Sequence, residues 1–200
     1  MNESEKADMF FAELGNNDLK ERSKAVEALA SMGKTEIIEH LISLLRKNSP
    51  RIVREGACKT LGKIGDKQAT DSLISVLDDP EESVRYQATI ALGQIGDNKA
   101  VNPLLSLLKR KDDPLVRSEA AKALGLIGDP SALKLLLNIL KKEDDRFLKY
   151  HAVTSLGRIG DPKAKKALEK ILKDETDDRL ILRSREAIEK IDQSSKIVAG

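Results

Sequence analysis

Aromatic residues are scarce in this chain of 200 residues, which has three Phe, two Tyr and no Trp. Its hydrophobic residues are therefore mainly aliphatic, which suits closely stacked helices better than a globular pocket. The single cysteine excludes an intrachain disulfide and fits a reducing compartment, so we expect a cytoplasmic protein. The first ten residues are too polar for a signal peptide, and no apolar run approaches the length of a membrane span. We therefore expect no membrane attachment.

An excess of charge of one sign is also missing. The chain has 35 basic and 33 acidic side chains, which gives a formal net charge of +2. This balance excludes a uniformly basic nucleic-acid binder, although it allows a local patch of one sign. Strand signals are absent as well, because no segment alternates apolar and polar residues over the length of a strand.

What the chain does have is a repeat of 31 or 32 residues, present in five copies. In each copy an apolar stripe at helical spacing ends at a glycine, and a second apolar helical stripe follows. Leu stands four positions and Ala eight positions before each of these glycines, which are Gly33, Gly65, Gly96, Gly128 and Gly160. A glycine is the usual helix terminator because it adopts positive φ. A helix pair of this kind cannot bury its apolar face alone, so the copies must stack on one another.

The spacing predicts a single repeat domain over residues 1–192. Residues 4–14 match a lone second helix that caps the first repeat, with Ser4 as its N-cap, and residues 18–178 hold the five helix pairs. Residues 179–192 match a lone first helix, in which Asp192 stands at the position of the glycine. We expect twelve helices in all, followed by a flexible tail over residues 193–200.

The repeated motif is VR-x-x-A-x-x-x-L-G-x-I-G-D, found at residues 53–66, 84–97 and 116–129. It resembles the HEAT-like repeat first associated with phycobilin lyase subunits, over roughly residues 18–192. The resemblance implies an all-α, right-handed α-solenoid (superhelix) of helix pairs. It is specific for the fold but not for the function, because similar repeats occur in scaffolds, in lyase subunits and in some metalloenzymes.

Two further positions recur in the first helices. A basic residue holds one of them, and we interpret the row as bridging to acidic corners between stacked repeats; its members are Arg22, Arg54, Arg85, Arg117 and Lys149. Glycine holds the other, inside a helix, where it costs about 1 kcal/mol against Ala. We interpret these glycines as places where neighbouring helices approach closely; they are Gly62, Gly93, Gly125 and Gly157.

Catalytic chemistry has little support in the sequence. The two histidines, His40 and His151, lie far apart, and a zinc site needs at least three N or S ligands. The metal-dependent hydroxylases that resemble this fold carry repeated His-Glu dipeptides, which this chain lacks. Cys58 stands at a position held elsewhere by small residues, so we interpret it as part of the core. We predict no catalytic residue, no cofactor and no metal, and an accessory subunit of a chromophore lyase or of another enzyme remains an alternative by resemblance alone.

One surface is informative. Positions 3, 6, 10 and 13 after each glycine share one exposed stripe of the second helix, and second helices line the concave face in proteins of this resemblance. The formal charge of these positions is −3 over the first two copies and +8 over the last three. We call the residues predicted to bind the partner the second-helix stripe; they are Lys99, Asn102, Lys109, Lys134, Asn138, Lys141, Lys163, Lys166, Lys170 and Lys173.

Two interpretations of this stripe remain open, a solvated face and a binding groove. As a groove, it predicts a non-catalytic protein-interaction scaffold that is basic toward its C-terminal end and binds an acidic segment of a partner protein. Lysine without arginine favours diffuse attraction over bidentate phosphate binding, and few aromatics are present to stack on bases. A nucleic acid or another polyanion bound through the same lysines is therefore the less favoured alternative.

Overall fold

The computed structural model describes residues 2–110 and 113–199, with side chains described as far as Lys196. Within these residues the chain forms twelve α-helices and five short 3-10 turns, and no strand. The predicted fold class, an all-α solenoid of helix pairs, is confirmed. The chain divides into two compact units, Met1–Ala100 and Val101–Gly200, which are described separately below.

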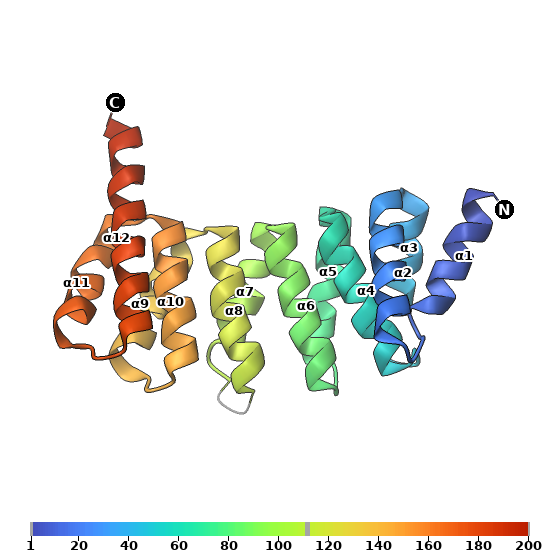
Figure 1. Ribbon diagram of the computed structural model, residues 1–200, viewed down its shortest axis with the longest axis horizontal. Coiled ribbons are helices and arrows are strands. Elements are labelled where there is room, and N and C mark those ends of the chain that lie inside the picture. The colour runs from blue at the N-terminus through green and yellow to red at the C-terminus, as the bar shows by residue number, and fades with distance from the viewer. Residues whose placement is uncertain (1, 111–112, 200) are drawn as a thin grey trace. The chain divides into compact units, whose positions relative to one another are not determined.

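In the first unit, the first helices of successive repeats stack side by side. Helix α4 packs against α2 on one side and α6 on the other, and the second helices α3 and α5 pack against the first helices that follow them (Figure 1). Helix α1 caps this stack by packing against α2. The helices are α1 (Glu3–Glu13), α2 (Leu19–Met32), α3 (Thr35–Leu44), α4 (Arg51–Ile64), α5 (Thr70–Ser75) and α6 (Glu82–Ile95).

The second unit repeats this arrangement. Helix α10 packs against α8 and α12, while α7, α9 and α11 each pack against the first helix that follows (Figure 1). The helices are α7 (Val101–Leu107), α8 (Pro114–Ile127), α9 (Leu133–Lys142), α10 (Arg146–Ile159), α11 (Lys165–Asp174) and α12 (Asp178–Ala199). Both units therefore place first helices in one layer and second helices in the other.

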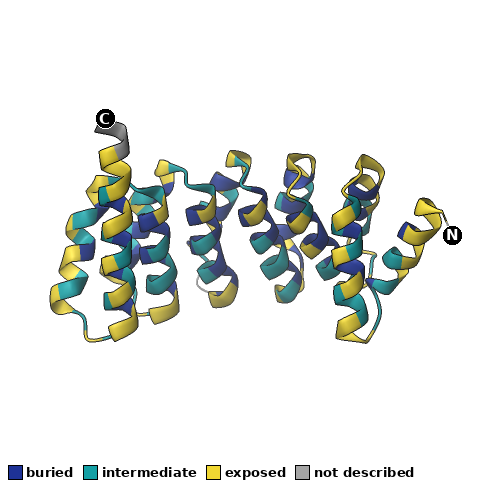
Figure 2. Ribbon diagram, turned by 45° about the horizontal axis from the view of Figure 1, so that its top comes forward, coloured by how far each residue is buried: buried dark blue, intermediate teal, exposed yellow. Residues whose placement is uncertain are grey.

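The core follows the register predicted from the glycines. In each unit the buried residues lie on the helix sides that face neighbouring helices (Figure 2). The Ala positions are fully buried, and the Leu positions are at most 1% exposed; they are Ala25, Ala57, Ala88, Ala120, Ala152, Leu29, Leu61, Leu92, Leu124 and Leu156. Because these residues are aliphatic, the helices approach closely without an aromatic core.

The terminating glycines have the predicted conformation. All five adopt positive φ, between 54° and 80°, and each donates its amide hydrogen to the carbonyl of the Leu four residues earlier. In four copies a 3-10 turn follows the glycine, at Lys67–Ala69, Asn98–Ala100, Pro130–Ala132 and Pro162–Ala164. The Asp after the glycine opens this turn; the Asp129 carboxylate, for example, accepts the Ser131 amide at 2.8 Å. The corner is thus built from local hydrogen bonds.

Three of the four glycines predicted to mark close helix approaches do so, namely Gly62, Gly125 and Gly157. A Cβ added at Gly62 would lie 2.8 Å from Cα of Ala91 on the neighbouring helix. A Cβ added at Gly157 would lie 2.8 Å from Cα of Ala187, and one at Gly125 would lie 2.6 Å from Cα of Ser155. Real side chains do not tolerate such distances to backbone atoms, so glycine is required at these positions for packing.

Both ends of the chain differ from the prediction in detail. The N-cap of α1 is Asn2, whose side chain accepts the Glu5 amide in a capping box, and Ser4 lies inside the helix. At the other end α12 continues to Ala199 and does not stop at 192 (Figure 1). The cause is local: Asp192 occupies the position at which every complete repeat has a glycine with positive φ, and a helix without that glycine has no reason to end there.

Candidate functional site

The second helices of the second unit carry a continuous set of exposed cations. Helix α9 buries Leu136 and Ile139 and exposes Lys134 and Lys141 on its opposite side. Asn138 lies between these lysines and is half-buried. The spacing of three and four residues puts polar and apolar side chains on opposite faces of the helix. Helix α9 therefore presents its lysines outward while its leucines hold it against α10.

Helix α11 continues the pattern with more charge. It buries Leu168 and exposes Lys166, Lys170 and Lys173, while Lys163 is exposed in the 3-10 turn before it. Acidic groups are present too, since Lys170 Nζ lies 4.0 Å from the Asp174 carboxylate and Glu169 is exposed on the same helix. Within the described part of the chain, hydrogen-bond and ion-pair partners are absent from the side chains of Lys134, Lys141, Lys163, Lys166 and Lys173.

The structure separates one predicted member of the second-helix stripe from the others. Lys99 belongs to the first unit, where its ammonium group lies 2.9 Å from the Asp71 carboxylate. The hydrogen bond from Lys99 to Asp71 raises the pKa of Lys99 above its ordinary value. Asn102 and Lys109 lie in the second unit and are exposed. The charge of Lys99 is therefore compensated internally, which the sequence sum did not anticipate.

Four members of the recurring basic row, the arginines, have structural partners, and two of them pair with acidic side chains as predicted. Arg54 is buried and forms a bidentate pair with the buried Asp79, through N–O distances of 2.8 and 2.9 Å. Arg117 pairs with Glu143 at 2.7 Å and donates to the Leu108 carbonyl. Arg22 and Arg85 donate to backbone carbonyls of the corners that precede their helices. These guanidinium groups hold the corners in place and are not available to bind phosphate.

The histidines and the cysteine occupy unrelated positions. His40 stacks on Phe11 in the first unit, with ring centroids 3.9 Å apart, and His151 lies in the second unit with its ring edge toward Tyr150. In the described residues, no group of three or more His, Cys, Asp or Glu side chains could hold a metal ion. Cys58 is fully buried, and burial raises the pKa of its thiol, which suppresses the reactive thiolate.

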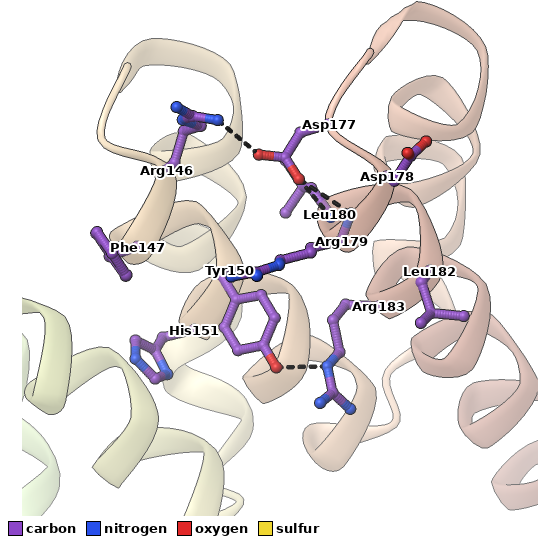
Figure 3. A pocket seen from close by; sticks show the side chains of 10 residues that line it. All are labelled: Arg146, Phe147, Tyr150, His151, Asp177, Asp178, Arg179, Leu180, Leu182 and Arg183. Carbon is purple, nitrogen blue, oxygen red and sulfur yellow. Dashed lines mark hydrogen bonds and ion pairs between the residues drawn. The ribbon is translucent and has the colours of Figure 1, made fainter.

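A groove that the sequence analysis missed lies on the other layer of the second unit. It has a volume of about 1020 Å³ and is lined by α10, α12 and the corner before α12 (Figure 3). Its exposed apolar side chains are Phe147 and Leu182, and its cations include Arg179 and Arg183. A signal was present in the sequence, because Phe147 and Leu182 are large apolar residues outside the core register.

Among the described helices, none combines the length and the apolar character that crossing a bilayer requires.

Comparison with known proteins identifies the repeat. The model of a family described as HEAT repeats matches residues 7–89, 70–153 and 103–189, which together make up most of the chain. Comparison with curated proteins gave no match.

Solved structures share the fold at low sequence identity. An engineered protein superposes with a TM-score of 0.59 at 22% identity, covering 96% of this chain and 100% of that one. A designed armadillo repeat protein in complex with the peptide (KR)4 gives 0.58 at 19% identity, with coverages of 92% and 98%. An archaeal HEAT-like repeat protein from Thermococcus onnurineus NA1 gives 0.57 at 17% identity, with coverages of 96% and 88%. At these identities the likeness extends to the fold alone.

Proposed function

This chain belongs to the HEAT-repeat family, and from that premise we propose that it is a non-catalytic protein-interaction scaffold that binds an acidic segment of a partner protein. The binding surface is the part of the second-helix stripe that lies in the second unit, on α9 and α11. The observation that carries the proposal is the set of exposed lysines there that have no partner within the described residues. A charged surface that is not neutralised internally attracts a partner of opposite sign.

The sign of the charge decides the class of partner. One similar structure, the designed armadillo repeat protein, holds the basic peptide (KR)4. The stripe on this chain is basic where it lacks internal partners, so the corresponding segment should carry Asp and Glu. Lysine is a strongly hydrated point charge without the planar fork of arginine, which favours a fast, salt-sensitive association over rigid recognition. We place this activity in the cytoplasm, where the single cysteine stays reduced.

The test compares charge reversals inside and outside the second-helix stripe. One variant replaces Lys134, Lys163, Lys166 and Lys173 with Glu. A control makes the same total change at exposed lysines outside the stripe, namely Lys20, Lys47, Lys59 and Lys190. Circular dichroism checks that both variants fold, and fluorescence anisotropy measures their affinity for an octapeptide of alternating Asp and Glu. We expect the stripe variant to lose binding and the control to keep most of it.

Ionic strength provides the second arm of the test. The screening length falls to about 8 Å at 0.15 M salt, so the affinity of the wild-type protein for the acidic octapeptide should drop as salt rises further. An oligothymidylate serves as the competing probe. Tighter binding of the oligothymidylate through the same lysines would replace the acidic peptide with nucleic acid as the partner. Equal losses in the stripe variant and the control would show that total charge matters and the stripe does not.

A further inference from the structure

The groove between α10 and α12 has apolar walls that the fold does not require. Phe147 is 77% exposed and Leu182 is 53% exposed, although both belong to helices whose other faces are well buried. Phe147 stands thirteen positions before the terminating glycine, a position that the other repeats fill with Lys20, Ile52, Ser83 and Leu115. Because Lys and Ser also occur at this position, the stacking of repeats does not require a large apolar side chain there. Exposed apolar side chains that gather at a groove are typical of an interaction site.

The charged groups at one rim of the groove are largely committed to each other. Arg146 donates to the Asp177 carboxylate at 3.1 Å, and the same carboxylate accepts the backbone amides of Arg179 and Leu180 at the start of α12 (Figure 3). Asp177 is thus both the N-terminal cap of the helix and the partner of Arg146. Its negative charge is therefore already balanced.

Arg183, a second cation that lines the groove, also has partners within the protein. Arg183 Nε donates to the Tyr150 hydroxyl at 2.5 Å, and Arg183 pairs with Glu186 at 2.6 Å. The guanidinium also lies over the Tyr150 ring, 5.2 Å from its centroid. These contacts hold Tyr150 as a fixed wall of the groove. His151 beside it has a pKa lowered by burial, so this neighbour is neutral at pH 7.

One cation in the groove remains unpaired. Among the described residues the Arg179 guanidinium has no hydrogen-bond or ion-pair partner. In Figure 3 its side chain extends from α12 toward α10, whereas the Asp178 side chain points away from it. The groove therefore offers two exposed apolar side chains, Phe147 on α10 and Leu182 on α12, with the uncompensated positive charge of Arg179 between them. The complementary chemistry is a large apolar side chain next to a carboxylate.

We propose that the α10–α12 groove is a docking site for a peptide segment of another protein, in which a Phe, Leu or similar side chain lies within two residues of an Asp or Glu. The apolar side chain packs against Phe147 or Leu182, and the carboxylate pairs with Arg179. This surface consists of first helices, so it is separate from the lysines of α9 and α11. The exposed Phe147 and Leu182 favour a peptide side chain over a nucleic-acid backbone as the occupant.

The experiment selects peptides from a randomised twelve-residue library displayed on phage, with the full chain as bait. We expect the enriched peptides to share an apolar residue close to an acidic one. Two groove variants are then compared with the wild type, Phe147→Ser with Leu182→Ser, and Arg179→Glu. The matched control combines Leu19→Ser, at a leucine that is 65% exposed in α2, with Arg185→Glu, at an exposed arginine of α12.

Each groove variant should weaken the binding of the enriched peptides at least tenfold in anisotropy titrations, while the control should change it less than twofold. The sharpest outcome is a switch of specificity: Arg179→Glu should prefer a peptide in which Lys replaces the acidic residue. A merely unfolded variant could not gain that preference. All substituted side chains are exposed or half-exposed, so circular dichroism should be unchanged.

Three results would overturn the proposal. The first is a selection in which no enriched peptide depends on Phe147, Leu182 or Arg179. The second is a dimer in sedimentation experiments that Phe147→Ser with Leu182→Ser dissociates, which would make a second copy of the chain the occupant. The third is oligothymidylate binding that Phe147→Ser abolishes while the selected peptides are unaffected. Loss of the acidic octapeptide on substitution of α9 and α11 lysines has no bearing on this site, so the two proposals fail independently.

Discussion

In the first unit the guanidinium of Arg54 is buried against Asp79, whereas in the second unit the equivalent Arg117 meets Glu143 at a partly exposed edge. The same contrast holds on the second helices. Lys99 of the first unit is paired with Asp71, while Lys134 of the second unit has no partner among the described residues. At these two positions the first unit pairs its cations within the chain, one of them in a buried pair, whereas the second unit leaves the equivalent cations more open to solvent.

This difference shows that one repeat sequence serves two purposes. The aliphatic register and the terminating glycines are the same in both units, so stacking does not depend on the surface charges. The positions outside the register are free to vary. Some of them stabilise corners in both units, as Arg54 and Arg117 do, and others in the second unit form the surfaces that we propose to bind partners.

The largest effect should come from breaking the buried pair of the first unit. Asp79→Ala leaves the buried Arg54 guanidinium without its carboxylate, and the loss of one partner of a buried pair costs about 3–5 kcal/mol. Urea unfolding measures the change in free energy. Asp71→Ala, which removes the exposed partner of Lys99, is the control and should cost less than about 1 kcal/mol. Similar losses for the two variants would contradict the internal role of the Arg54–Asp79 pair.

Glycine substitutions inside first helices should lower the stability of both units by similar amounts. They therefore test whether the two units differ only in their charged side chains. Gly62→Ala and Gly125→Ala each push a methyl group onto the backbone of a neighbouring helix, and overpacking of this kind costs about 1–3 kcal/mol. Fluorine NMR of the 3-fluorotyrosine-labelled protein separates the units, because Tyr86 lies in the first and Tyr150 in the second. An increase in stability for either variant would show that helix propensity outweighs the close approach.

The Arg117–Glu143 ion pair of the second unit should contribute less to stability than the Arg54–Asp79 pair of the first unit. Glu143→Ala removes a hydrogen bond to a charged group, worth about 1–2 kcal/mol, but Arg117 keeps its bond to the Leu108 carbonyl and reaches solvent at its partly exposed edge. The measurement is urea unfolding, followed through the fluorine NMR signal of 3-fluorotyrosine at Tyr150. If Glu143→Ala destabilised the protein as much as Asp79→Ala, the two ion pairs would contribute equally to stability, which would contradict the proposed difference between the units.

Sequence alone predicted the elements that repetition specifies. Several features recur in the repeats: the helix pairs, the core register, the glycines at helix ends and the close approaches at Gly62, Gly125 and Gly157. Because they recur, each copy strengthens the prediction made for the others. The continuation of α12 past 192 was missed because it follows from the absence of a glycine at one position. The pairing of Lys99 with Asp71 joins side chains 28 residues apart, which depends on how the helices stack.

The α10–α12 groove escaped the sequence analysis for a similar reason. Phe147 and Leu182 stand at two different positions of the repeat, and neither position is apolar in every copy. Arg179 looks like any other surface arginine until its neighbours are known to be paired. Whether the lysines of α9 and α11 bind a partner stays a prediction, since exposure alone does not distinguish a binding surface from a solvated one.

The smallest expected effect is on the pH dependence of stability, and it comes from His151 in the second unit. Burial lowers the pKa of His151 below its ordinary value of 6.5, with Lys122 and Arg158 acting in the same direction and Glu119 and Asp145 opposing them. The unfolded chain therefore binds a proton near pH 6.5 that the folded chain does not bind until the pH is lower. Stability from this source is complete above pH 6.5 and declines as the pH falls below it.

His151→Gln removes this proton uptake. Urea unfolding between pH 5 and 7.5 should therefore show a shallower loss of stability on the acid side in the variant than in the wild type. The carboxylates with lowered pKa, such as Asp129 and Asp177, lose their charge at still lower pH and do not interfere. An unchanged slope would mean that the imidazole is solvated in the folded protein.

Cys58 gives the first unit a reporter of its own opening. It is the only cysteine in the chain, and in the native packing of α4 it is fully buried with its thiol kept protonated. A thiol reagent can therefore react only when α4 separates from its neighbours, so the labelling rate measures the free energy of that event without any substitution. If the first unit opens independently of the second, Asp79→Ala will speed labelling strongly and Glu143→Ala will not. The same rate reveals whether a ligand that binds in the second unit stiffens the first.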